Sequence, residues 1–238
     1  MRSPRCAPVN SGAPFAQRWW RSRSLRCLSR PPKLELEPDP LPAGDRPIAE
    51  PERTRSLSPG RTWESASRAF AGLLAGGDVL DAASGDGALA ELIAPGCRSL
   101  TCLDVSAKVV AAGQKRLARF GHARFVEGDM HQLPFDADSF DLVLLMSALP
   151  YARDVRAVLR EVARVLRPTG GLIGGTLARH KHAQAVAPYG HVNLGFATDE
   201  LRADLEATGF DVALCEVTHT ERRTPHFQII TLHAARRS

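Results

Sequence analysis

Residues 79–87, with the sequence VLDAASGDG, decide the fold of this chain. A short apolar strand leads into a glycine-rich turn, and apolar residues then return at helical spacing from Ala88 to Ile93. Gly85 and Gly87 allow the backbone to bend tightly and to approach a ligand without Cβ clashes. The helix that follows offers free N–H groups to a carboxylate or phosphate. The stretch predicts a ligand at a strand–turn–helix unit, although glycine turns also occur for structural reasons alone.

Strand-like and helical segments alternate along the rest of the chain. Helical spacing is found in residues 63–75, 88–93, 107–120, 155–166 and 198–208, with Ser106 as the N-cap of the third segment and a cap expected for the last. Strand-like runs occupy residues 79–80, 100–105, 123–126, 140–146, 172–177, 211–218 and 226–233. This alternation predicts an α/β doubly wound sheet, in which ligands bind beyond the carboxyl ends of the strands.

Acidic residues follow the second and third predicted strands. Asp104 lies 23 residues after Asp81, and a carboxylate there can accept hydrogen bonds from both hydroxyls of a ribose. Asp129 is placed to accept a hydrogen bond from an adenine amino group, with Met130 packing on the ring. A glycine turn combined with these acids indicates a cofactor that contains a nucleoside.

Residues from about 58 to 238 resemble a class I S-adenosylmethionine-dependent methyltransferase of type 11. The similarity rests on VLDAASGDG, on Asp104, on Gly128-Asp129-Met130, and on the segments LPFDADSFDLVLL and REVARVLRPTGGL. The resemblance implies a seven-stranded, mostly parallel, Rossmann-like sheet, S-adenosyl-L-methionine as cofactor, and methyl transfer to an unidentified small molecule. The cofactor-binding residues that it implies are Asp81, Ala83, Ser84, Gly85, Gly87, Asp104, Val105, Asp129, Met130, Met146 and Ser147. Ala83 stands where glycine is most common, which a negative φ would permit.

Two alternative interpretations remain open. The segments 58–64, 194–196 and 225–228 resemble methyltransferase domains fused to ArsR-type regulators, so a cofactor-binding regulatory module without turnover is one alternative. However, residues 1–57 show no winged-helix pattern. The second is an NAD-dependent oxidoreductase, because Ala83, Gly85 and Ala88 can be aligned with a dinucleotide fingerprint. That fingerprint lacks its first glycine here and gives Asp129 no role.

Methyl transfer is an in-line displacement in which the protein mainly supplies proximity and alignment. A general base is needed only where the nucleophile must lose a proton. Tyr151 and His191 are the catalytic candidates, although each is also compatible with a purely structural position.

No metal site is predicted, because the pair His180 and His182 lacks a third ligand. The cysteines at 97, 102 and 215 have ordinary spacing and are expected to be small buried side chains.

Residues 1–57 differ in composition from the rest. The first 60 residues hold 11 of the 17 prolines and 11 Lys and Arg against six Asp and Glu, which accounts for the whole net charge of +5. We expect a disordered basic extension followed by one domain from 58 to 238. Residues 1–30 could also be a mitochondrial transit peptide, or a basic arm for nucleic acid, or arise from a misassigned start. Otherwise a cytoplasmic protein without a membrane span is expected. The neutral remainder makes nucleic acid an unexpected partner, and the sequence leaves the oligomeric state open.

Overall fold

The computed structural model describes residues 76–238, and the statements below concern that part of the chain. The predicted helix at 63–75, the extension at 1–57 and the transit-peptide interpretation lie outside the described residues. The elements begin with β1 (Asp78–Ala82), α3 (Ala88–Ile93), β2 (Ser99–Asp104), α4 (Ala107–Leu117), β3 (Ala123–Glu127) and β4 (Phe140–Met146). They continue with α5 (Val155–Val165), β5 (Leu166–Leu177), α6 (Ala183–Val186), α7 (Thr198–Ala207), β6 (Phe210–Thr220) and β7 (Gln228–Arg236). Single 3₁₀ turns are found at Ala94–Gly96, Leu149–Tyr151 and Ala187–Tyr189.

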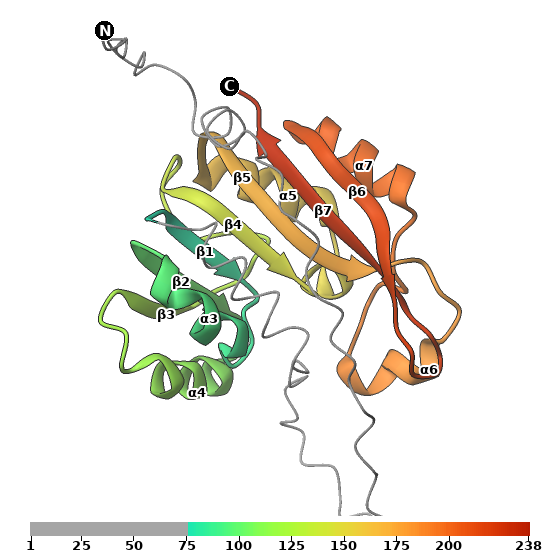
Figure 1. The fold of residues 1–238 in the computed structure, drawn as a ribbon, viewed down its shortest axis with the longest axis horizontal. Helices are drawn as coiled ribbons and strands as arrows, with labels where there is room; N and C mark the ends of the chain where they lie inside the picture. Colours follow the sequence, from blue (N-terminus) through green and yellow to red (C-terminus); the bar gives the residue numbers. More distant parts are fainter. Residues whose placement is uncertain (1–75) are drawn as a thin grey trace, which may run out of the picture.

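The seven strands form one sheet in the order β3-β2-β1-β4-β5-β7-β6 (Figure 1). The pairs from β3 to β5 are parallel, and β7 runs antiparallel between β5 and β6. This confirms the predicted doubly wound, mostly parallel α/β sheet. The helices between these strands return the chain to the same starting edge, so β1, β2, β4 and β5 run in one direction. Their carboxyl ends therefore meet at one edge of the sheet.

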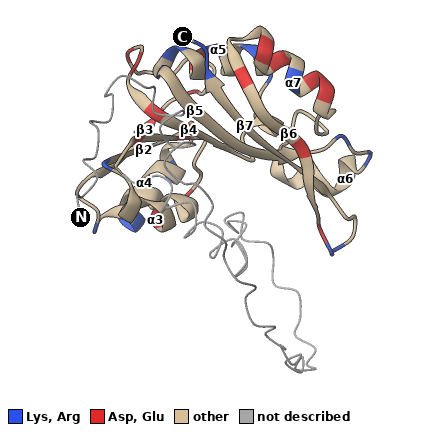
Figure 2. Ribbon diagram, turned by 45° about the horizontal axis from the view of Figure 1, so that its top comes forward, with Lys and Arg blue, Asp and Glu red and all other residues tan. Residues whose placement is uncertain are grey.

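Helices cover both faces of the sheet. Figure 2 shows α5 and α7 on one side of the strands and α3 and α4 on the other. Each side has its own buried cluster, one around Leu80, Leu145, Leu159 and Leu205, the other around Ile93, Leu100, Val110 and Phe125. Burial on both faces explains why β4 reads as an almost continuous apolar run. Helix α7 is predominantly acidic (Figure 2), with the single basic residue Arg202 among Asp199, Glu200, Asp204 and Glu206.

Most predicted boundaries are confirmed, and three need correction. Helix α5 ends at Val165 and β5 begins at Leu166, which pairs with Phe140. Residues 167–170, between the predicted helix and the predicted strand, form a bulge within β5, after which Gly171 pairs with Leu142. Helix α4 ends at Leu117, because the Phe120 N–H donates to the Leu117 carbonyl in a tighter turn. Helix α7 begins after Ala197 with no side-chain cap, whereas Ser106 caps α4 as predicted by accepting from the Val109 N–H at 3.4 Å.

We predict that Gly113→Val destabilises the fold through overpacking. A Cβ at Gly113, in the middle of α4, would lie 2.1 Å from the Phe125 ring. The free energy of unfolding should fall by about 1–3 kcal/mol, measured by urea denaturation. The matched control is Ala112→Val, one position along the same helix and exposed, where only helix propensity changes. Equal losses for the two variants would contradict this packing.

Candidate functional site

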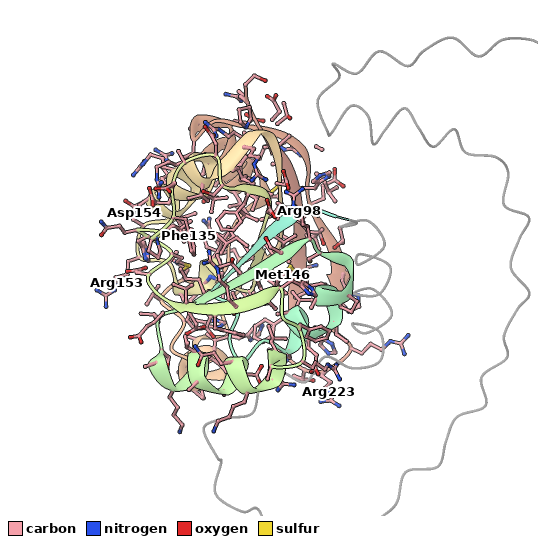
Figure 3. The ribbon with its side chains drawn as sticks, turned by 90° about the vertical axis from the view of Figure 1, so that its left-hand side faces the viewer. Arg98, Phe135, Met146, Arg153, Asp154 and Arg223 are labelled. Carbon is pink, nitrogen blue, oxygen red and sulfur yellow. The ribbon has the colours of Figure 1, made fainter. Side chains whose placement is uncertain are left out.

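The predicted site residues lie together at the carboxyl edge of the parallel strands. The glycine turn follows β1, Asp104 ends β2, and Met146 and Ser147 end or follow β4. In the sheet, β1 lies between β2 and β4, so these three segments are neighbours. Figure 3 shows Met146 in the interior of the molecule and Arg153 and Asp154 at its rim. Separate stretches of sequence thus converge on one region.

The Asp104 carboxylate joins the glycine turn to the end of β2. Its Oδ2 accepts a hydrogen bond from the Gly85 N–H at 3.0 Å, and its Oδ1 accepts one from the Ser106 N–H at 3.0 Å. The Ser84 N–H donates to the Leu103 carbonyl at 2.9 Å and closes the same junction. A carboxylate offers about four acceptor positions, so Asp104 retains capacity for two further donors. It is half-buried and can be reached from solvent.

The turn itself leaves open space beside its backbone. A Cβ placed on Gly85 would meet no atom within 4 Å, and Gly85 has φ +58°. Gly87 also has a positive φ, but a Cβ there would lie 2.8 Å from Phe125, so its role is close packing. Ala83 has φ +59°, which corrects the expectation of a negative value. A left-handed alanine costs roughly 1–2 kcal/mol, and here the turn imposes that conformation.

Two oxygen atoms under this turn are buried without a hydrogen-bond partner among the described residues. They are Oδ2 of Asp81 and Oγ of Ser84. Burial, together with the nearby Asp104 charge, raises the pKa of Asp81 to about 7. An acid held in this way is ready to accept a hydrogen bond from a donor group on a ligand, and such unpaired buried oxygens are rare in folded proteins.

The residues after β3 form hydrogen bonds among themselves and with the segment after β4. Oδ1 of Asp129 accepts from the His131 N–H at 2.9 Å and contacts His131 Nδ1 at 2.6 Å, and these contacts lower the pKa of Asp129. The Arg153 N–H donates to His131 Nε2 at 3.2 Å, so a neutral His131 carries its proton on Nδ1. Met130 is buried in the core cluster that contains Leu133. Beside Asp104, Val105 is 72% exposed and offers an apolar surface.

The two catalytic candidates are in contact. The Tyr151 and His191 rings lie edge to face with centroids 4.9 Å apart. Burial raises the pKa of Tyr151, and Tyr189 and Asp104 raise it further. Burial lowers the pKa of His191, and the charge of His180 makes a smaller contribution in the same direction. A neutral imidazole beside the sheet edge can accept a proton, so the geometry permits but does not require a base.

Asn193 holds this pair in place and was missed by the sequence analysis. Its side-chain amide donates to the Ala152 carbonyl at 2.6 Å and to the Leu149 carbonyl at 3.3 Å, and its N–H donates to the Pro150 carbonyl at 3.1 Å. These contacts fasten the segment before α7 to the 3₁₀ turn after β4. Nothing in the local sequence around Asn193 distinguishes it from an ordinary loop asparagine.

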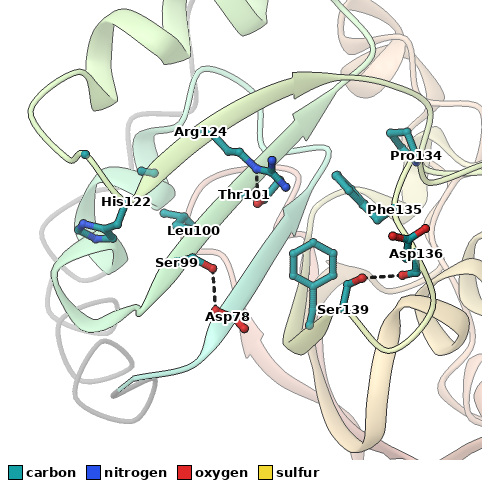
Figure 4. Close-up of a pocket in the computed structure, with 13 residues that line it drawn as sticks. Asp78, Ser99, Leu100, Thr101, His122, Arg124, Pro134, Phe135, Asp136 and Ser139 are labelled. Atoms are coloured by element: carbon teal, nitrogen blue, oxygen red, sulfur yellow. Dashed lines mark hydrogen bonds between the residues drawn. The ribbon is translucent and has the colours of Figure 1, made fainter.

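A different cavity, of about 500 Å³, opens where the strands begin rather than where they end (Figure 4). Its lining includes Asp78, Ser99, Thr101, Arg124 and Phe135. Asp78 forms ion pairs with Arg98 and Arg167, which hold its pKa well below the usual range. This cavity contains none of the predicted cofactor residues. Its polar groups are partly paired with one another, as in the bonds from Ser99 to Asp78 and from Arg124 to Thr101.

Within residues 76–238 no group of three or more His, Cys, Asp or Glu side chains could hold a metal ion. The three cysteines of this region are free. Cys102 and Cys215 belong to the two different core clusters, so the thiols do not converge. No helix in the described part of the chain has the length and apolar character needed to cross a membrane.

Comparison with known proteins shows similarity to a family and to a fold. Residues 80–174 match the family model described as a methyltransferase domain. A demethylmenaquinone methyltransferase from Clavibacter sepedonicus is 32% identical over 118 residues, which cover 50% of this chain and 48% of that protein. The chain spans about half the length of the curated relatives it matches.

Solved structures agree on the fold. The YcgJ protein from Bacillus subtilis has a TM-score of 0.63 at 18% identity, covering 75% of this chain and 99% of that one. The [4+2]-cyclase SpnF has a TM-score of 0.64 at 18% identity, covering 79% of this chain and 85% of that one. Because a protein named as a cyclase shares this fold, the fold by itself does not specify the reaction.

We predict that the buried Asp81 makes stability depend on pH. Its raised pKa means that the folded state holds the proton more tightly than the unfolded chain, where an aspartate titrates near 4. Stability is therefore lost as the pH rises from about 4 to about 7. Asp81→Asn cannot titrate. The free energy of unfolding of Asp81→Asn minus that of wild type, measured by urea denaturation, should be larger at pH 7.5 than at pH 4.5. A difference that does not change with pH would contradict the assignment.

Proposed function

We propose that this chain, whose residues 80–174 match the methyltransferase-domain family model, is a class I methyltransferase that transfers a methyl group from S-adenosylmethionine to a small organic molecule. The observation that carries the proposal is the junction between the glycine turn and Asp104. There, open space, spare carboxylate acceptor positions and unpaired buried oxygens lie together.

The donor groups of S-adenosylmethionine fit this set of acceptors. Its ribose has two hydroxyls, for which Asp104 has acceptor capacity left after its backbone hydrogen bonds. Its methionine end has an ammonium group, which suits the buried acceptors Asp81 and Ser84 under the turn. Its adenine has flat ring faces that pack on apolar surface, and the exposed Val105 provides such a surface. Gly85, Ala83, Gly87, Asp129, Met130, Met146 and Ser147 complete the proposed cofactor site.

When bound, the cofactor supplies an electrophilic methyl group on a sulfonium, so the main tasks of the protein are alignment and exclusion of water. The fixed turn and Asp104 would set the position of the cofactor. Tyr151 and His191, held by Asn193, stand beside β4 where an acceptor can approach the methyl group. His191 is the proposed proton acceptor for a nucleophile that must lose a proton.

The proposed acceptor is a small molecule with apolar character. Tyr151, Tyr189, Val192 and Leu194 are all large hydrophobic residues that remain exposed beside the site. An apolar rim of this kind favours an organic ligand over a nucleic acid. The names of the relatives from Clavibacter and other bacteria refer to a demethylated menaquinone, which is consistent with a ring-containing acceptor. The NAD interpretation gains no support, because nothing in this arrangement requires a second nucleotide.

We predict that Gly85→Val abolishes binding of S-adenosylmethionine in titration calorimetry, because its side chain would enter the space beside the turn. The matched control is Gly209→Val, which also has a positive φ and no atom within 4 Å of its Cβ but lies after α7. Both variants should lose about 1–3 kcal/mol of stability.

Asp104→Ala should weaken binding by about 1–3 kcal/mol through the lost hydrogen bonds.

Circular dichroism of each variant establishes that it is folded. If folded Gly85→Val binds S-adenosylmethionine as tightly as Gly209→Val does, the proposed cofactor site is wrong. Unchanged affinity in folded Asp104→Ala would remove that residue from the site while leaving the turn in place.

A further inference from the structure

A second cavity, of about 380 Å³, lies at the same sheet edge as the proposed cofactor site. Its lining comes from the end of β5 and the residues after it, from the end of β6 and from the start of β7: Ala178, Arg179, His180, His182, Thr220, His226, Phe227 and Gln228. Figure 1 shows α6 and the β6–β7 hairpin side by side at this end of the sheet. The proposed function assigns no role to any of these residues.

His180 is held in one tautomer by its neighbour. The His182 N–H donates to His180 Nδ1 at 3.2 Å, so a neutral His180 must carry its proton on Nε2. Burial, together with the nearby His182, lowers the pKa of His180 and favours that neutral ring. His180 Nε2 is buried and has no hydrogen-bond partner among the described residues. His180, one of the residues that line the cavity, therefore has an N–H donor that still needs an acceptor.

Flat rings surround this donor. The Phe227 ring lies 4.7 Å from His180 and 5.8 Å from His182 between centroids, at steep angles in both cases. The two histidine rings are stacked with centroids 6.0 Å apart. Faces and edges arranged in this way pack well against a planar ring of a ligand.

The charges of the cavity favour a neutral ligand. Arg179 is the one lining residue with a permanent charge, and its guanidinium is ion-paired with Glu200 outside the cavity. His226 Nδ1 contacts the Glu221 carbonyl at 3.1 Å. A carboxylate ligand would thus find its cationic partner already taken, whereas a carbonyl oxygen needs only the N–H of His180.

The cavity is connected with the proposed catalytic pair. The pKa of His191 responds to His180, and His191 in turn lies against Tyr151. Tyr151 itself responds to the charge of Asp104, whose carboxylate holds the glycine turn. His180 of the cavity is thus an electrostatic neighbour of His191, whose ring contacts that of Tyr151.

We propose that this cavity binds a neutral aromatic ring carrying a carbonyl oxygen, which accepts a hydrogen bond from His180 Nε2 while the ring packs on Phe227. The identification of this ligand with the methyl acceptor rests on the proposed function. Binding itself does not, since none of the residues involved belongs to the proposed cofactor site.

The test uses the full chain with ¹⁵N-labelled histidine. Long-range ¹H–¹⁵N spectra report the tautomer of each ring, and His180 should have its proton on Nε2. The probes are 1-acetonaphthone and its oxygen-free counterpart 1-ethylnaphthalene, titrated with and without S-adenosylhomocysteine. The ketone should bind about five-fold more tightly or better, as one net hydrogen bond implies, and it alone should shift the His180 N–H signal.

Variants locate the preference. His180→Phe keeps a flat ring but loses the donor, so both probes should bind equally. The control His219→Phe changes an exposed histidine of β6 that does not line the cavity, and should preserve the preference. Where His180→Phe does not fold, the tautomer and probe preference of the wild type decide alone.

Three results would overturn the inference: a proton on Nδ1 of His180, equal affinity of the wild type for the two probes, or no binding of the ketone. If S-adenosylhomocysteine binds and the ketone does not, this inference fails and the proposed function stands. If the ketone binds and neither S-adenosylhomocysteine nor S-adenosylmethionine does, the proposed function fails and the cavity assignment stands.

Discussion

The hydrogen bond from the Gly85 N–H to the Asp104 carboxylate fixes the relation between two strands and the turn that joins one of them to its helix. The Ser84 N–H, which donates to the Leu103 carbonyl at 2.9 Å, also holds this turn. With these two hydrogen bonds, the open space beside Gly85, the buried acid at Asp81 and the spare acceptor positions of Asp104 keep a constant geometry. Preorganisation of this kind is what alignment-based catalysis requires, because the reacting groups must be placed before the bond changes begin.

The two edges of the sheet carry different kinds of polar group. At the amino edge, Asp78 and Asp141 are paired with Arg98 and Arg167, and these contacts stabilise the fold. At the carboxyl edge, Asp81 Oδ2 and His180 Nε2 are buried without partners in the described part of the chain. Leaving a buried polar group unpaired is costly, so unpaired donors and acceptors at one edge mark where ligands are expected.

Local patterns in the sequence were sufficient for the parts of the fold that depend on local physics. The strand–turn–helix unit, the capping serine of α4 and the run that becomes β4 each follow from short-range spacing, and the order of motifs brought Asp104 and the glycine turn to one edge. The parts that were missed depend on distant contacts. The hydrogen bond from the Arg153 N–H to His131 joins two loops, and Asn193 donates to carbonyls more than 40 residues away.

The φ of Ala83 is another feature that local sequence patterns could not predict. Its value is set by how β1 and β2 are joined, which the residue type cannot report. Likewise, the position of β7 between β5 and β6 was not predicted, because strand order is a property of tertiary pairing. The His180 tautomer, on which the ligand preference of the second cavity depends, results from one backbone N–H two residues away.

The central claim is that the cofactor binds at the turn held by Asp104 and not in the cavity where the strands begin. Amide chemical shifts of the ¹⁵N-labelled protein, recorded while S-adenosylhomocysteine is added, test this claim directly. The account predicts that the largest changes fall on Ser84, Gly85 and Gly87 and on the amides from Asp104 to Ser106. Changes centred on Ser99, Thr101 and Gly121, with the turn unaffected, would contradict it.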